Sequence, residues 1–395
     1  MASLRLLDVV RQHGPAYLER FSGSILPSHA AALAAIANCR TAKLGGHMGQ
    51  CSHCGAEHVL LNSCRHRACP QCGHSQAERW LARQQERLLP VAYFHVVFTL
   101  PAELRRVVRA HQKLLIGAMF GATFESLALL AKDPRFLGAA QIGALAVLHT
   151  WTRTLEWHPH IHMLVPAGGL AEDGRTWLEP KEREKPFLVP VHALSDVFRA
   201  TFAKRARKAV PGVVLAQRAF DKRWVTFSKP VVQGPESVLQ YLGRYVYRTA
   251  LSDKAIVHVD ETSVTFRYRR SQDHTRRTMR LDAHEFLRRF LQHVPPRGFH
   301  RVRSFGLLHP SRRNTLGRLQ LLLTRPPHAT QHGDVGDPTP QTAPPSPKLR
   351  CPHCHQATLQ LVQRLTPAEC EILLATTPPS LPAADKAPTP KGSSP

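Results

Sequence analysis

The sequence has few acidic side chains for its length. Asp and Glu number 28 in 395 residues, against 53 Lys and Arg, which leaves a formal net charge of +25 and a pI of about 10.5. An excess of this size favours a polyanionic partner such as nucleic acid, because each neutralised phosphate releases condensed counterions. A merely basic, soluble protein is the alternative on charge alone.

Long hydrophobic runs are also lacking. No window approaches the roughly 18 uninterrupted apolar residues of a membrane-spanning helix, so we expect no membrane span. The first stretch, MASLRLLDVVRQHG, turns polar after a few residues and lacks a signal-peptide core. We therefore expect a cytoplasmic, nucleoid-associated bacterial protein. Thiols stay reduced there, so the nine cysteines predict metal ligands rather than disulfides.

Changes in composition divide the chain into segments. The sequence shows no internal repeat of fixed period. Apolar spacing near 3.6 predicts short helices at the start, and Ser75 with Glu78 predicts a capping box that begins a later helix. The predicted divisions are a helical region (1–45), a zinc-binding module with its following helix (46–90), a larger domain (91–310), a Pro-rich linker (311–350), a candidate CxxC knuckle (351–371) and a disordered tail (372–395).

The larger domain mixes strand and helix patterns. β-branched and aromatic residues predict strands in AYFHVVFTLP (92–101), residues 156–166, RWVTFSKP (223–230) and SVTFRYRR (263–270). We expect a mainly helical stretch between the first two strands, up to about Leu148. FLVPVHALSDVFRATFAKRARK predicts a strand passing into a basic helix, and further helices are predicted in GPESVLQYLGRYVYRTALS and AHEFLRRFLQHV.

Two CxxC pairs, Cys51/Cys54 and Cys69/Cys72, are separated by 14 residues. Each pair can turn two thiolates onto one ion, and the spacing is close to that of a short zinc ribbon. We predict a structural rather than a catalytic zinc ion, because two complete pairs leave no open coordination position.

Other cysteines and histidines surround these pairs. Cys64 and His66 lie between them and could replace one ligand or help to bind a second ion; a free thiol and a surface histidine are the alternative. A later pair, Cys351 and Cys354, is followed by no second CxxC. Whether it binds zinc stays open, since the only candidate ligands nearby are His353, His355 and Cys370.

Histidines alternate in the predicted strand EWHPHIHMLVPAGG. Side chains of a strand alternate between its faces, so one face would carry Glu156, His158, His160 and His162, and the core-facing side Ile161, Met163 and Val165. Two imidazoles at alternate positions can hold a divalent ion with open positions, as catalysis requires. Chance is the alternative in a chain with 24 histidines. Pro159 donates no ladder hydrogen bond, which predicts an edge or a bulge there.

The segment YLGRYVYR places Tyr241 and Tyr245 four residues apart, on one helical face, with Arg244 and Arg248 spaced in the same way. A phenolic oxygen can attack a phosphodiester and hold the product as a phosphotyrosine. The guanidinium groups are suited to bracing a phosphate. Considered alone, tyrosines on an amphipathic helix are more often packing residues.

Together these motifs resemble a known family. HPHIHMLVPAGG resembles the histidine–hydrophobic–histidine motif of single-strand endonucleases, the group that contains rolling-circle replication initiators and relaxases. GPESVLQYLGRYVYR, VTFRYR and FLQHVPPRGFHRVRSFG resemble more narrowly the rolling-circle insertion-sequence transposases of the insertion sequence ninety-one type, which also carry an N-terminal cysteine-rich zinc region. The resemblance covers roughly residues 10–310 in collinear order.

The resemblance implies an α+β fold, in which a central, mostly antiparallel sheet carries the histidine motif between flanking helices, beside an N-terminal helical and zinc-ribbon-like module. Residues 91–310 would form the catalytic domain of a DNA transposase. One tyrosine would cut a single strand and keep a 5′-phosphotyrosine, and the other could serve the second cleavage or the strand transfer.

The resemblance also implies cofactors and partners. His160 and His162 would hold Mg2+ or Mn2+ with a third ligand; His158 and Glu156 are candidates, although relatives often take this ligand from the tyrosine helix. Zn2+ would be structural. The implied partners are single-stranded DNA at element termini and target DNA, and a homodimer is left open.

The sequence departs from the family pattern in three places. His66-Arg67-Ala68 stands where such proteins usually have Asn-Arg-His, and Tyr247 stands where the helix often has histidine. The long Pro-rich tail has no counterpart in the pattern. Two alternatives remain: a zinc-ribbon DNA-binding protein or inactive transposase relic, and a metallohydrolase. The metallohydrolase is disfavoured because Met163-Leu164-Val165 follows the repeat where an Asp or His would complete its site.

Overall fold

The computed structural model describes residues 4–181, 188–231, 250–270, 273, 275–324, 350–355 and 358–376, and for 73–79 it describes the backbone alone. The chain divides into two compact units. The first comprises Met1–Leu33 and Arg67–Gly333, and the second comprises Ala34–His66 and Asp334–Pro395. The second unit therefore joins segments that lie far apart in the sequence.

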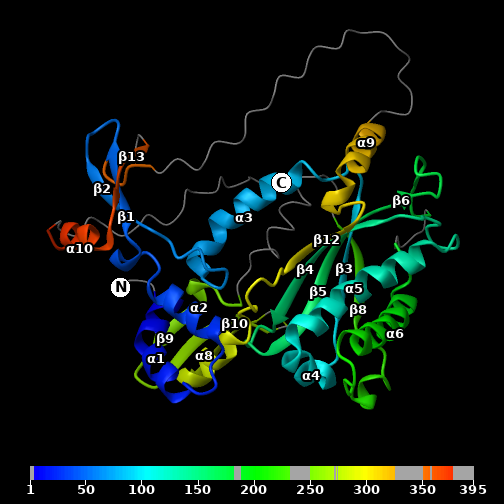
Figure 1. Cartoon of the computed structure of the whole chain (residues 1–395), viewed down its shortest axis with the longest axis horizontal. Helices are drawn as coiled ribbons and strands as arrows, with labels where there is room; N and C mark the ends of the chain where they lie inside the picture. Colours follow the sequence, from blue (N-terminus) through cyan, green and yellow to red (C-terminus); the bar gives the residue numbers. More distant parts are fainter. Residues whose placement is uncertain are drawn as a thin grey trace, which may run out of the picture. The chain divides into compact units, whose positions relative to one another are not determined.

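A five-stranded antiparallel sheet organises the first unit, in the order β12-β4-β5-β3-β8 (Figure 1). Its strands are β3 (Tyr93–Thr99), β4 (Gly143–Trp151), β5 (Trp157–Pro166), β8 (Thr226–Val231) and β12 (Val302–Gly306). The predicted α+β class, with an antiparallel sheet that carries the histidine motif, is confirmed.

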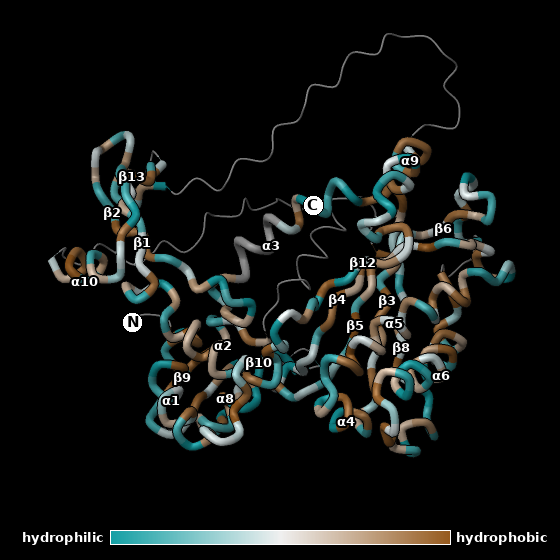
Figure 2. Tube along the Cα trace, viewed as in Figure 1, coloured by the Kyte–Doolittle hydropathy of each residue, from teal (hydrophilic) through white to brown (hydrophobic). Residues whose placement is uncertain are grey.

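Three helices pack against one face of this sheet: α4 (Arg105–Ala110), α5 (Gln112–Ala131) and α6 (Val191–Ala209). The rings of Phe98 on β3 and Phe198 on α6 meet edge to face, with centroids 4.9 Å apart. Hydrophobic stretches run along α5 and the central strands (Figure 2). By length and composition α5 is the one described helix that could cross a membrane, and 56% of it is buried in the chain, as in the core helix of a folded domain.

The opposite face of the sheet is covered at one end. Leu145 of β4 and Leu164 of β5 pack there with Leu89 and with Leu316 of α9 (Arg313–Thr324), in a second hydrophobic cluster. Partly buried side chains of α3 (Pro70–Gln85) pack against the same cluster. At its other end this face carries the histidines of β5.

A smaller sheet with the order β11-β10-β9 also belongs to the first unit. Phe266 of this sheet packs against Phe286 of α8, with ring centroids 5.8 Å apart, and the Asp282 side chain caps α8 by accepting two backbone N–H groups. The elements here are α1 (Leu6–Arg20), the first part of α2 (Pro27–Ala37), β9 (Ile256–Val259), β10 (Ser263–Arg269), β11 (Arg276–Asp282) and α8 (Ala283–Leu291), besides the short ribbon β6 (Gly169–Leu170) and β7 (Trp177–Leu178).

The second unit contains a three-stranded antiparallel sheet with the order β13-β1-β2. Its elements are β1 (Gly46–Cys51), β2 (Glu57–Leu61), β13 (Leu359–Leu365) and α10 (Pro367–Thr376). Cys51 pairs with Leu359 and Gly46 with Leu365, so the last strand among the described residues lies beside the first.

Most predicted elements of the larger domain are present in the structure. Strands occupy 93–99, 157–166, 226–231 and 263–269, and helices occupy 191–209 and 283–291. The bulge alternative for Pro159 is confirmed, because His160 pairs with His149 and Trp157 with Trp151, which leaves two β5 residues opposite one β4 residue.

Several predictions were wrong. The stretch expected to be mainly helical contains α4 and α5, but its end, from Gly143 onward, belongs to the strand β4. Residues 188–190 before α6 form no strand. The helix expected to begin at Ser75 begins at Pro70, with Cys69 as its N-cap. The expected linker contains α9, and α10 continues to Thr376, past the point where the tail was expected to begin. The predicted helix with Tyr241 and Tyr245 lies outside the described residues.

Candidate active site and metal centres

The histidines of β5 share one face of the strand, as predicted. His158, His160 and His162 are partly exposed, whereas the intervening core-facing residues Ile161 and Met163 are fully buried. The alternation therefore gives β5 a hydrophobic face toward the helices and an imidazole face toward the open end of the sheet.

A third histidine comes from the neighbouring strand. His149 on β4 lies directly opposite His160, and its ring is held against Trp151 by stacking, with centroids 4.5 Å apart. One ring nitrogen from each of His149, His160 and His162 lies within 4.8 Å of the other two. Three imidazoles gathered in this way could hold one divalent ion and leave positions open for a substrate.

Hydrogen bonds fix which nitrogens can serve as ligands. His160 Nδ1 lies 2.8 Å from the carbonyl oxygen of His158 and donates its proton there, which leaves Nε2 with a free lone pair. Burial lowers the pKa of His160 from its usual value, so the imidazole stays neutral and able to coordinate.

His95 of β3 supports His162 in the same manner. The two rings are stacked with an interplanar angle of 4°, and His95 Nε2 lies 2.8 Å from His162 Nδ1. Burial, followed by the charge of Lys229, lowers the pKa of His95 to about 4 and keeps its ring neutral. If His162 donates from Nδ1 to His95, its Nε2 is the nitrogen that could coordinate a metal.

His158 occupies a different place from the one predicted for a ligand. Its Nδ1 accepts a hydrogen bond from the Arg105 guanidinium at 2.5 Å, and it is absent from the group of three imidazoles. The bulge lies between Trp157 and His160 and so includes His158 itself, which breaks the regular spacing of the strand. Glu156, the other candidate, is exposed and precedes β5. The third candidate ligand in the structure is His149. The sequence had suggested His158 or Glu156 for that position.

The three imidazoles lie in a cleft of about 990 Å³. Basic side chains line the same cleft, together with one phenol: Arg153, Lys254, Arg267, Tyr268, Arg269 and Arg276. Arg269 and Arg276 stand directly opposite each other on β10 and β11, an arrangement of like charges that is unfavourable without an anion. The cleft therefore combines a candidate metal site with a surface suited to a phosphate backbone.

The predicted nucleophiles and their arginines, Tyr241, Tyr245, Arg244 and Arg248, lie outside the described residues. The residues on either side of them are described. Val231 ends β8, and Ala250 lines the cleft. In the sequence Tyr245 precedes Ala250 by five residues.

Eight of the nine cysteines form two groups of four, which corrects the predicted ligand set. Cys51 and Cys54 do not share a site with Cys69 and Cys72. One group consists of Cys51, Cys54, Cys351 and Cys354, and the other of Cys39, Cys64, Cys69 and Cys72; within each group all sulfur atoms lie within 4.8 Å of one another.

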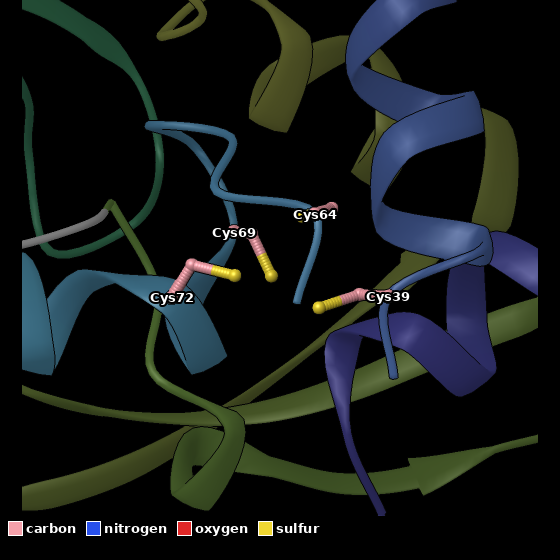
Figure 3. Close-up of side chains that lie close together, drawn as sticks. All are labelled: Cys39, Cys64, Cys69 and Cys72. Carbon is pink, nitrogen blue, oxygen red and sulfur yellow. The ribbon is translucent and has the colours of Figure 1, made fainter. Parts of the chain in front are cut away.

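The group around Cys69 is shown in Figure 3. Cys69 and Cys72 lie at the start of α3, where the N–H of Cys72 donates to the carbonyl of Cys69 at 3.2 Å. Cys64 accepts a hydrogen bond from the backbone N–H of His66, and the His66 ring is not one of the four ligand positions. Cys39, which the sequence prediction missed, is the fourth member. Four thiolates could hold one structural zinc ion.

Comparison with known proteins places these features in context. Residues 143–315 match the family model described as "Putative transposase", and residues 9–100 match the one described as "Transposase zinc-binding domain". The three clustered histidines lie in the first region and Cys39 to Cys72 lie in the second, whereas Cys351 and Cys354 lie outside both.

Two relatives match most of the chain. It is 37% identical over 387 residues to "Putative transposase y4qJ" of Sinorhizobium fredii (strain NBRC 101917 / NGR234), with 90% of this chain and 94% of that protein covered. It is 31% identical over 288 residues to the "Transposase for insertion sequence element IS801" of Pseudomonas savastanoi pv. phaseolicola, with 68% of each chain covered. No solved structure matches the chain.

Proposed function

Because the chain belongs to the transposases of the insertion sequence ninety-one type, we propose that it nicks single-stranded DNA at the ends of its element through a tyrosine nucleophile and transfers the strand by rolling-circle transposition. One observation carries the proposal. Three imidazoles line a basic cleft. Ala250 lines the same cleft and comes, in the sequence, directly after the segment that contains Tyr241 and Tyr245.

The donor set fits a divalent ion such as Mg2+ or Mn2+. His149, His160 and His162 would supply three nitrogens and leave about three positions of an octahedral ion for phosphate oxygens and water. An ion bound there would polarise the phosphate and stabilise the charge that develops during cleavage. His95 and the carbonyl of His158 keep the rings in a coordinating orientation.

The tyrosines would carry the covalent chemistry. The phenolic oxygen of Tyr241 or Tyr245 would form a bond to phosphorus while the bond from phosphorus to the 3′ oxygen breaks. The phenol loses its proton and the departing 3′ oxygen gains one, which leaves a 5′-phosphotyrosine and a free 3′-hydroxyl. In the transfer step a 3′-hydroxyl attacks the phosphotyrosine and the phenol is released. Arg244 and Arg248 would brace the phosphate.

Single-stranded DNA would lie in the basic cleft. Arg153, Arg267 and Arg269 could neutralise its phosphates, and Tyr268 offers a base a stacking surface. The zinc-binding region would be structural, because four thiolates leave no position for substrate. With DNA as its substrate, the protein would act at the nucleoid.

A covalent-adduct assay tests the proposal. Purified full-length protein with Mn2+ and a labelled single-stranded element end should form an adduct that survives SDS. Changing Tyr241→Phe together with Tyr245→Phe should abolish the adduct, because the phenolic oxygens are lost, and His160→Ala should weaken it greatly.

Tyr268→Phe is the matched control, because it removes a phenol that lines the same cleft but is not proposed as the nucleophile. It should keep the adduct. Adduct formation by the double Phe variant would disprove the tyrosine assignment. DNA binding without an adduct in the unaltered protein would instead favour an inactive relic that binds DNA.

A further inference from the structure

The zinc-binding region contains more cysteines than one site can use. The segment 9–100 that matches the zinc-binding family model has six, and four of them make up the group in Figure 3. The remaining two, Cys51 and Cys54, lie with Cys351 and Cys354. We propose that these four cysteines bind a second structural zinc ion, which fastens the C-terminal segment 350–376 to the β1–β2 hairpin.

The sulfur positions match a tetrahedral zinc site. Cys51 Sγ lies 3.6 Å from Cys354 Sγ, and Cys54 Sγ lies 3.8 Å from Cys351 Sγ. A zinc–sulfur bond of about 2.3 Å places tetrahedral sulfurs about 3.8 Å apart. A disulfide would bring two sulfurs to about 2.05 Å. The spacing is therefore that of four ligands around one ion.

The two CxxC turns share two backbone features. The N–H of Gly55 donates to the carbonyl of Cys51 at 3.0 Å, and the N–H of His355 donates to the carbonyl of Cys351 at 3.0 Å. Both turns end in the left-handed region, with φ of 71° at Gly55 and 59° at His355. Residues other than glycine rarely adopt this φ, yet His355 adopts it at the same position of its turn as Gly55.

Backbone amides in both turns point at sulfur. The N–H of His53 donates to Cys51 Sγ at 3.4 Å, and the N–H of His353 donates to Cys351 Sγ at the same distance. Such donors stabilise thiolates rather than thiols, and four thiolates around Zn2+ retain a net charge of about −2. His58 of β2 could add a side-chain donor when its Nε2 carries the proton, since this nitrogen lies 3.5 Å from Cys351 Sγ.

Packing alone holds the C-terminal strand weakly. β13 exposes most of its side chains, including the apolar Leu361 (59% exposed) and Val362 (62%), and Leu365 at its end is the buried residue of the strand. The strand nevertheless pairs along the length of β1. With so little apolar burial, metal coordination would supply the binding energy that keeps this distant segment in the sheet.

Zinc analysis of the full-length protein tests the inference. The unaltered chain should carry about two zinc ions. Cys351→Ser with Cys354→Ser should lower this to about one, and Cys69→Ser with Cys72→Ser should also leave about one. Cys370→Ser is the matched control, because Cys370 is buried in the same C-terminal segment but belongs to neither group. It should retain both ions. An unchanged zinc content in the Cys351/Cys354 double variant would overturn the inference.

A cleavage experiment tests the fastening role separately from nicking activity. A specific protease site inserted between Thr324 and Arg350 would sever the connection to the C-terminal segment. After cleavage, the fragment should still co-elute with the rest of the chain in zinc buffer. It should be released by a chelator or in the Cys351/Cys354 double variant. Equal retention in that variant and in the unaltered protein would show that zinc does not fasten the segment.

Discussion

His149 and His160 face each other across the β4–β5 pair, with their imidazole centroids 5.5 Å apart and their ring planes nearly perpendicular. The two histidines come from adjacent strands that are connected by a hairpin. With His162 they form a group of three imidazoles drawn from two strands. A flat row could bind an ion only from one direction, whereas a group on two strands can surround it.

We therefore predict that His149→Ala removes divalent-ion binding as effectively as His160→Ala. Loss of a direct ligand should lower adduct formation by more than about 100-fold at limiting Mn2+, since loss of a supporting partner alone costs about 10–100-fold. His158→Ala is the control on the same strand face, because its ring is hydrogen-bonded to Arg105 instead. If His158→Ala is impaired and His149→Ala is not, the ligand assignment is wrong.

His95 should matter although it is outside the group of three. His95→Ala removes the hydrogen-bond partner of His162 Nδ1, so the His162 ring can rotate and change tautomer. Affinity for Mn2+, measured by titration in the adduct assay, should fall by about 10–100-fold. His95→Gln offers an amide oxygen as a replacement acceptor and should recover part of the loss. Equal affinity in all three proteins would contradict a supporting role.

The sequence predicted β5 and its two faces well, because Ile161, Met163 and Val165 alternate with histidines and only one face is buried. It did not predict β4. In GALAVLHTW every residue is buried on both faces of the strand, which produces a continuous apolar run. Such a run has no period of two, and it cannot be told from a buried helix by pattern alone. The third histidine was missed for this reason.

The grouping of the cysteines into two sites was not predicted from the sequence, for a different reason. Two CxxC pairs near each other in the chain predict one site, and local spacing supports that choice. The structure instead pairs Cys51 with Cys354, 303 residues away. The number of cysteines was the signal that the sequence offered. Cys39 and Cys64 complete a set of four with Cys69 and Cys72, and Cys51 and Cys54 then form a second set with the later pair.

We predict that lowering the pH reduces the free energy of unfolding even at pH values where carboxylates are still ionised. His293 is buried, with Nε2 donating to the Leu155 carbonyl and Nδ1 beside the Thr150 hydroxyl. Burial is the main cause that lowers the pKa of His293 from 6.5 to about 4. Below pH 6.5 the unfolded chain gains a proton that the folded chain does not, so stability falls as the pH drops from 6.5 to 4.

The expected loss from His293 is about 2 kcal/mol at pH 5 relative to pH 7.5. Urea unfolding of the unaltered chain and of His293→Gln at both pH values measures it. The variant should lose less stability on acidification than the unaltered chain. The same pH dependence in both proteins would show that His293 does not titrate in this way.

The opposed arginines of the cleft should govern DNA affinity through salt. Arg269 and Arg276 repel each other across β10 and β11, and a phosphate between them would relieve that repulsion. Changing both to Ala should weaken the binding of single-stranded DNA. The slope of log affinity against log salt should become shallower by roughly 0.7 for each phosphate that the protein no longer neutralises.

Fluorescence anisotropy with a labelled oligonucleotide in EDTA, over a salt series, measures this slope without cleavage. Arg207→Ala on α6 is the charge-matched control, since α6 covers the other face of the sheet. It should leave the slope as it is in the unaltered protein, because DNA in the cleft would not reach that helix. A slope unchanged in the double variant, or reduced equally by Arg207→Ala, would place the DNA elsewhere.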